Sequence, residues 1–78
     1  MKTLYDLKIN DSASIKNIYC QNRTKRRMMD LGIVKGTQVR VILNSPSGNP
    51  RAYEVRGSVI AIRSEDARKI EVVLWNLD

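Results

Sequence analysis

The fold is decided by the stretch Arg26-Arg27-Met28-Met29-Asp30-Leu31-Gly32-Ile33-Val34-Lys35-Gly36-Thr37-Gln38-Val39-Arg40-Val41, which reads as a helix end, two glycine turns and the start of a strand. Gly32 follows the last expected helical residue, where a left-handed residue is usually glycine because glycine has no Cβ. Met28 and Ile33 are then the pair expected to make the hydrophobic contact of a Schellman stop. Gly36 suits the positive-φ position of a type II turn. The rest of the chain must pack around this corner.

Short strands are predicted on both sides of the corner, because apolar and polar residues alternate there. In the first strand Ile18 falls out of phase with Ala13 and Ile15, which predicts a bulge or the end of the strand nearby. The expected strands cover residues 13–19, 37–44, 53–56, 58–63 and 70–74.

Two helical segments are predicted among these strands. The longer one runs to about Leu31, and Asn22 or Thr24 is expected to cap its start. Ser64 is expected to cap a single helical turn ahead of the last strand.

The ends of the chain and its turns complete the expected architecture. Thr3 is expected to cap a short first turn, whose Leu4 and Leu7 plug one end of a small core. Asn10 is the residue best able to take left-handed angles in the turn that follows. The run Ser45-Pro46-Ser47-Gly48-Asn49-Pro50 is dense in helix and strand breakers and must be a loop. So many short strands in 78 residues predict one mainly β domain, 1–78, built as a small closed or nearly closed barrel.

The charge balance favours an acidic partner. The chain has 14 basic and 8 acidic residues and a net charge of +6, which suits an acidic protein, nucleic acid or an anionic membrane surface. A well-solvated surface is the plainer interpretation. The densest run is Arg23, Lys25, Arg26 and Arg27 on the expected helix, which forms either a docking face or a solvated helix face.

Nucleic-acid binding finds less support, because it usually needs aromatic platforms beside the charge. The aromatic residues are Tyr5, Tyr19, Tyr53 and Trp75, and none lies in a run typical of RNA-binding modules. Trp75 could anchor a partner or lie over one end of the barrel.

Catalysis and a bound cofactor are not expected. The chain has no histidine, so the commonest general base and metal ligand is missing. Its acidic residues are dispersed, no glycine-rich phosphate motif is present, and no cluster supports a metal site. Cys20, the single cysteine, is expected to be a half-buried apolar residue at a strand end.

The chain also lacks signals for export. No apolar run approaches the ~20 residues that cross a bilayer, and the N-terminus lacks the apolar core of a signal peptide. A single cysteine suits a reducing compartment. We therefore expect a cytoplasmic protein with no membrane insertion.

An ordered set of motifs resembles the FeoA family (ferrous-iron transport protein A). The set begins with Thr3-Leu4 and Leu7-Lys8 and covers about residues 3–74. It continues with Leu31-Gly32-Ile33, Lys35-Gly36-Thr37, the loop Ser45–Pro50, Ala61-Ile62-Arg63, Ala67 and Ile70-Glu71-Val72.

This resemblance implies an SH3-like small β-barrel that acts as a non-enzymatic accessory or adaptor in bacterial ferrous-iron uptake. Proteins similar to this chain accompany FeoB, a membrane permease with a cytoplasmic GTP-binding domain, so FeoB is the expected partner. Iron is linked to the chain only through this transport role, and no cofactor is expected. The same fold occurs as the C-terminal domain of iron-dependent repressors, where it is an interaction module.

Three functional hypotheses therefore remain open: an adaptor for the permease, a small nucleic-acid-binding barrel, and a regulatory module that self-associates through exposed strand edges. For the adaptor, the expected partner-binding residues are Arg23, Arg26, Arg27, Pro46, Gly48 and Pro50. Leu31, Gly32 and Gly36 are assigned to the fold.

Overall fold

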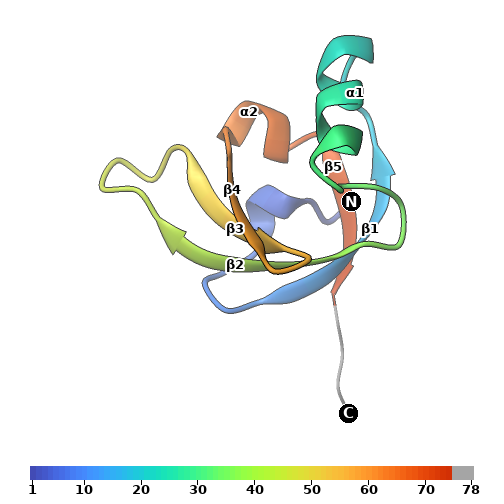
Figure 1. Ribbon diagram of the computed structural model, residues 1–78. Coiled ribbons are helices and arrows are strands. Elements are labelled where there is room, and N and C mark those ends of the chain that lie inside the picture. Colours follow the sequence, from blue (N-terminus) through green and yellow to red (C-terminus); the bar gives the residue numbers. More distant parts are fainter. Residues whose placement is uncertain (75–78) are drawn as a thin grey trace.

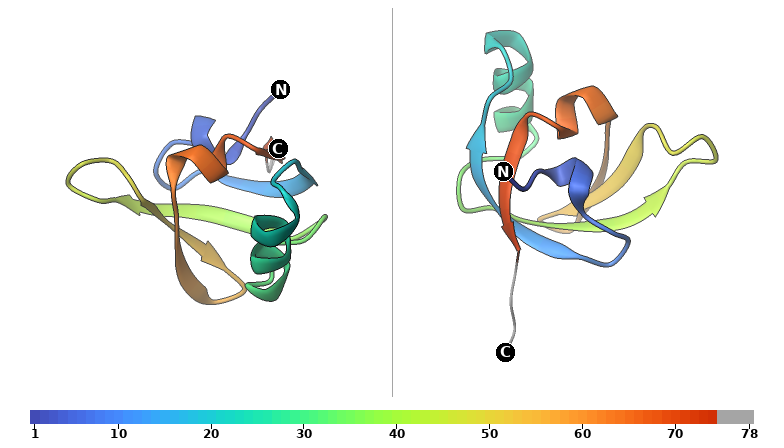
Figure 2. Two further views of the ribbon diagram at one scale, coloured as in Figure 1. Left: turned by 90° about the horizontal axis from the view of Figure 1, so that it is seen from above. Right: turned by 180° about the vertical axis from the view of Figure 1, so that it is seen from behind.

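The computed structural model describes residues 1–74 of the chain. Within them, five strands form one antiparallel sheet in the order β4-β3-β2-β1-β5. The elements are η1 (Leu4–Asp6), β1 (Ser12–Ile18), α1 (Asn22–Asp30), β2 (Gln38–Asn44), β3 (Arg51–Val55), β4 (Ser58–Ile62), α2 (Ser64–Ala67) and β5 (Ile70–Leu74), shown in Figure 1. The sheet curls into an incomplete barrel, as the views in Figure 2 show. This confirms the predicted mainly β class with one inserted helix and a helical turn before the last strand.

The core fills the inside of the curled sheet. Leu4 and Leu7 are buried, which confirms that the first turn plugs one end of the core. The buried apolar side chains are Leu4, Leu7, Ala13, Ile15, Cys20, Met28, Ile33, Val39, Val41, Tyr53, Val55, Ile62, Ala67, Ile70 and Val72.

The helix end at Gly32 has the predicted Schellman geometry. Gly32 has φ +90°, its N–H donates to the Met29 carbonyl at 3.0 Å, and the Ile33 N–H donates to the Met28 carbonyl at 2.9 Å. Met28 and Ile33 are both buried. The two bonds satisfy carbonyls that a helix C-terminus otherwise leaves unpaired.

The second glycine turn is fixed to β1 and to the helix end. The Thr37 N–H donates to the Val34 carbonyl at 2.9 Å, and Gly36 has φ +90°, as the type II turn predicts. The Gly36 N–H donates to the Ile15 carbonyl at 2.8 Å. The buried Thr37 hydroxyl donates to the Gly32 carbonyl at 3.0 Å, which ties the two turns together. Sequence reasoning gave Thr37 no such role.

Both predicted helix N-caps are wrong. The predicted residues were Asn22 or Thr24 for α1 and Ser64 for α2. Gln21 and Arg63 occupy the two N-cap positions instead, and neither makes a side-chain capping bond. Ser64 is the first residue of α2, and its N–H donates to the Asn49 side-chain oxygen at 3.0 Å.

Strand irregularities were predicted in part. The pairing of β1 with β5 shifts between Ile15 and Asn17, which confirms the bulge predicted near Ile18. A second shift between Val41 and Leu43, where β2 pairs with β3, was not predicted. The last strand has the expected bounds, and the bounds of the other strands differ from the expected ranges by at most two residues.

A buried arginine joins η1 to the sheet. The Arg51 side chain donates from Nε to Asn44 Oδ1 at 2.8 Å, from Nη1 to the Tyr5 carbonyl at 3.2 Å and from Nη2 to the Leu7 carbonyl at 2.7 Å. The buried Tyr53 hydroxyl donates to the carbonyl of Leu4 at 3.3 Å. These bonds hold the first turn over the core.

Candidate functional site

The helix α1 contributes little to the core. Only Met28 is buried among its nine residues, whereas a helix that serves a core usually buries a whole stripe of side chains. Figure 1 shows its first turns rising beyond the sheet. Most of α1 is therefore available to a partner.

The cations of α1 lack partners within the described part of the chain. Arg23, Lys25, Arg26 and Arg27 are all exposed. The ion pairs found in residues 1–74 involve other cations: Lys16 with Glu71 at 3.8 Å, Arg40 with Glu54 at 3.1 Å, and Arg63 with Asp66 at 3.6 Å. The helix dipole disfavours cations in the first turns and favours Arg27 in the last turn, so folding does not explain the charge at the start of α1.

The predicted partner-binding residues do not form one surface. The loop 45–50, which contains Pro46 and Gly48, extends away from α1 in Figures 1 and 2. Arg23 lines a shallow hollow at the start of the helix. Arg27 and Pro50 line one hollow together in the described part of the chain.

The hollow that Arg27 and Pro50 share, which we call the α1–β4 groove, has a volume of about 290 Å³. Its helix side is formed by Arg27, Met28 and Leu31, and its strand side by Ala61, Ile62 and Arg63. Leu31 is 39% exposed, so an apolar surface is open to solvent between the two arginines. Sequence reasoning assigned Leu31 to the fold alone and missed the three residues of the strand side.

A second hollow lies on the other flank of α1. Lys25 and Met29 are four residues apart and share that flank, whereas Arg27 and Leu31 share the flank facing β4. The second hollow has a volume of about 250 Å³ and is lined by Lys16, Asn17, Ile18, Lys25, Met29, Val34 and Lys35. Both flanks of the helix therefore combine apolar side chains with cations.

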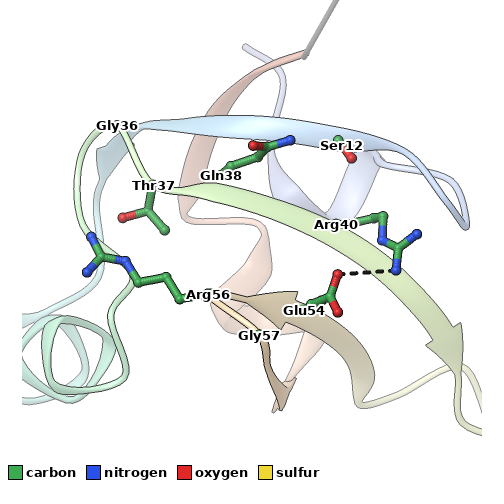
Figure 3. A pocket seen from close by; sticks show the side chains of 8 residues that line it. All are labelled: Ser12, Gly36, Thr37, Gln38, Arg40, Glu54, Arg56 and Gly57. Atoms are coloured by element: carbon green, nitrogen blue, oxygen red, sulfur yellow. Dashed lines mark ion pairs between the residues drawn. The ribbon is translucent and has the colours of Figure 1, made fainter.

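A third hollow, drawn in Figure 3, is polar and open. Arg40 and Glu54 form an ion pair across it at 3.1 Å, while Arg56 points away from them towards Thr37. Glu54 is the one carboxylate that lines it. The remaining lining residues are Ser12, Gly36, Gln38 and Gly57.

The ionisable groups with shifted pKa values have structural causes. The Thr3 N–H donates to the Asp6 carboxylate at 2.9 Å and lowers the pKa of Asp6. A hydrogen bond from Asn17 lowers the pKa of Glu71. Burial raises the pKa of the Cys20 thiol and disfavours the thiolate. Each of these shifts follows from a local hydrogen bond or from burial.

Two further results concern metals and membranes. No group of three or more His, Cys, Asp or Glu side chains that could hold a metal ion exists among residues 1–74. Within the same residues, no helix is long and apolar enough to span a bilayer. The predictions made for Trp75 lie outside the described residues.

Two curated proteins are similar to the chain. The first, a fusion of Fe(2+) transport protein A and the Fe(2+) transporter FeoB from Porphyromonas gingivalis, is 31% identical over 71 residues, which are 91% of this chain and 8% of the fusion protein. The second, a putative Fe(2+) transport protein A from Campylobacter jejuni, is 31% identical over 92% of this chain and 97% of its own length.

Solved structures share the fold. The FeoA protein of Chlorobium tepidum has a TM-score of 0.92 and 30% identity, over 97% of this chain and 72% of that one. FeoA of Stenotrophomonas maltophilia, described as an SH3 domain protein and solved with zinc, has a TM-score of 0.81 and 28% identity, over 94% and 91% of the two chains. A manganese-dependent transcriptional repressor, 17% identical over 95% of this chain and 41% of the repressor with a TM-score of 0.84, shares the fold alone.

The family model for the FeoA domain matches residues 2–74. That range contains the glycine corner, the Arg51 network and both sides of the α1–β4 groove. The protein folded around Gly32 and Gly36 therefore belongs to the FeoA family.

Proposed function

We propose that the protein is a non-enzymatic accessory of ferrous-iron uptake that docks on the cytoplasmic part of a FeoB-type permease. One observation carries the proposal: in the similar protein of Porphyromonas gingivalis, a FeoA segment and FeoB occur in a single fusion protein. Parts that are joined in one chain in one organism often act together when they are separate chains in another.

The surface of the protein supports docking more than catalysis. The exposed cations of α1 have no carboxylate partner among residues 1–74, and apolar side chains lie open beside them on both flanks of the helix. Such a surface suits an acidic partner, because complementary charge steers association and apolar contact adds affinity. Iron is handled by the permease in this proposal, and the accessory acts through protein contact.

The test is binding of the purified protein to the intact permease in lipid nanodiscs, with and without guanine nucleotide. A variant with Arg23, Arg26 and Arg27 changed to serine should bind at least about tenfold more weakly, and its binding should depend less on salt. A matched variant with Arg40, Arg56 and Arg68 changed to serine removes the same charge from other elements and should bind nearly normally.

Deletion of the gene in cells supplies the second readout. Ferrous-iron uptake should change when the gene is deleted and should recover with the unaltered protein, but not with the α1 variant. Absence of binding under both nucleotide conditions, together with unchanged uptake in the deletion strain, would refute the proposal.

The net charge of +6 keeps a nucleic-acid-binding barrel as the second candidate. It requires an affinity for DNA or RNA that falls steeply as salt rises. A gel shift at low salt that the α1 variant abolishes would favour it, whereas a protein that leaves both nucleic acids unshifted would exclude it.

A further inference from the structure

The two edges of the sheet differ in what covers them. The edge at β5 is partly paired, since Thr3 bridges Glu71 and the Val72 N–H donates to the Lys2 carbonyl at 2.8 Å. The edge at β4 pairs with no other strand in residues 1–74. The difference leaves β4 as the place where another chain can add to the sheet.

The register of the β3–β4 hairpin shows which backbone groups point outwards. A two-residue turn, Arg56-Gly57, joins the strands, and Val55 pairs with Ser58 next to it. In such a hairpin the pair beside the turn exchanges hydrogen bonds, and bonded and non-bonded pairs then alternate along the strands. Ser58, Ile60 and Ile62 therefore direct their N–H and C=O groups to β3. The same groups of Val59 and Ala61 are directed to the uncovered edge.

The side chains of β4 do not protect this edge. Proteins usually blunt an exposed edge with charged residues, proline or a bulge. Residues 58–62 read Ser-Val-Ile-Ala-Ile, with neither charge nor proline, and Val59 is 62% exposed. The strands β3 and β4 pair without a bulge from Arg51 opposite Ile62 to Val55 opposite Ser58.

The α1–β4 groove reaches the C-terminal end of this edge. Ala61 and Ile62 are successive strand residues, so their side chains lie on opposite faces of the sheet. A hollow lined by both of them lies at the C-terminal end of β4, where Pro50 and Arg63, just outside the two strands, also line it. On its other side stand Met28 of α1 and Leu31, which caps the end of that helix. The view from above in Figure 2 shows α1 beside the β3–β4 hairpin. An edge strand facing a helix across an apolar hollow is the arrangement in which domains bind peptides by strand addition.

The charges around the groove select the occupant. Arg27 stands on the helix side and Arg63 on the strand side, and the one acidic lining residue, Asp66, is held by Arg63 at 3.6 Å. The hollow, of about 290 Å³, has room for a short stretch of extended chain between α1 and β4. We propose that the α1–β4 groove binds an extended acidic segment of a partner protein, which pairs with Val59 and Ala61 as an added strand of the sheet.

This inference deepens the proposed function by giving the mode of docking, and it rests on that function only in naming the partner. Backbone pairing supplies affinity, and side chains of alternate residues supply specificity. In the added segment, apolar side chains face Met28 and Leu31, while acidic residues at its ends meet Arg27 and Arg63.

The test uses the full chain labelled with ¹⁵N and two kinds of probe. One is a set of overlapping peptides that tile the cytoplasmic segments of the permease. The other is a short synthetic peptide of alternating valine and threonine with glutamate at each end, compared with the same peptide carrying lysine instead. We expect the acidic peptide and at least one permease peptide to slow hydrogen exchange at the amides of Val59 and Ala61. The amides of Ile60 and Ile62, already bonded to β3, should change little, and the lysine peptide should not bind.

Variants separate strand addition from ordinary contact. Ala61→Pro removes an outward N–H and should weaken binding about tenfold or more, whereas Ala61→Val keeps the N–H and serves as the matched control. Peptides methylated on alternate backbone nitrogens give the same test without altering the protein, because only one of the two methylation patterns should abolish binding.

Each other outcome overturns a stated part of the inference. Failure of every peptide, or binding that leaves the amides of Val59 and Ala61 unprotected, overturns strand addition. Protection that rises with protein concentration in the absence of peptide shows that a second copy of the chain occupies the edge instead. If the intact permease binds without protecting these amides, the proposed docking on the permease is retained and strand addition at the α1–β4 groove is refuted. If only the synthetic peptide protects them, strand addition at the groove is supported and the permease is refuted as the partner that supplies the strand.

Discussion

Replacement of Arg51 by methionine should strongly destabilise the protein. The side chain is 8% exposed and donates to Asn44 Oδ1 at 2.8 Å and to the carbonyls of Leu7 and Tyr5 at 2.7 and 3.2 Å. Methionine fills a similar volume but leaves these acceptors without a donor. Hydrogen bonds from a charged group are worth about 1.5–3 kcal/mol each, and burial of the charge offsets part of that sum. A net loss of about 2–4 kcal/mol follows.

The loss is large for a domain of 78 residues. In domains of this size, 1 kcal/mol shifts the melting temperature by about 4–8 °C, so we expect a fall of roughly 8–30 °C. Thermal melts followed by circular dichroism, with urea denaturation to give the free energy of unfolding, measure it. Arg51→Lys keeps the charge but loses the planar fork of donors. Its melting temperature should lie between those of Arg51→Met and the unaltered protein.

Arg40→Met is the matched control, because Arg40 forms an ion pair with Glu54 at 3.1 Å while its side chain is 48% exposed. Exposed ion pairs contribute about 0–1 kcal/mol. If Arg51→Met melts as high as Arg40→Met, the network does not hold the first turn to the sheet and the reasoning is wrong.

Three further predictions concern other parts of the chain. Gly32→Val should lower the free energy of unfolding, measured by urea denaturation, by over about 1 kcal/mol because a β-branched residue is strained at φ +90°. Gly32→Asn should lower it less. Equal stabilities of the two variants would contradict this. The pKa of Asp6 is lowered when folded, so its contribution is complete above the unfolded pKa and is lost as pH falls through the folded pKa. In Asp6→Asn, the free energy of unfolding should therefore fall less steeply as the pH is lowered. The same steepness in the variant and the unaltered protein would refute this. Cys20 is buried and its pKa is raised, so it should react with iodoacetamide far more slowly than in urea-unfolded protein, which mass spectrometry tests.

Local backbone chemistry explains why the corner could be predicted from sequence. Gly32 and Gly36 need positive φ values whatever surrounds them, and the spacing between Met28 and Ile33 follows from the stop motif. Asn10, with φ +74°, was recognised by the same rule. These features depend on a few neighbouring residues, so one sequence is enough to find them.

Features that depend on distant residues were missed or misassigned. Ser64 looked like a cap, but its N–H is satisfied by Asn49, which lies 15 residues earlier in the chain. Arg51 meets Asn44 only because strands β2 and β3 pair in a register that brings those residues opposite each other. Neither contact leaves a local pattern in the sequence.

In the candidate site too, features of neighbouring residues could be predicted from the sequence, and contacts between distant residues could not. The charge of α1 was visible in the sequence, and so was the apolar character of β4 on both faces. Their meeting was not, because Arg27 and Ala61 line one hollow only after the sheet has curled. Pro46 and Gly48 were predicted to bind the same partner as the helix cations, whereas the fold carries their loop away from α1.

The position of α1 connects the fold to the proposed function. The helix buries only Met28, so its own packing explains little of its presence. The Schellman stop at Gly32 and the Thr37 hydroxyl nevertheless hold its last turn firmly to the start of β2. That attachment fixes Leu31 across the α1–β4 groove from Ala61 and Ile62 of β4. The glycine corner therefore does more than turn the chain, since it holds in place the helix side of the groove that the proposed partner segment enters.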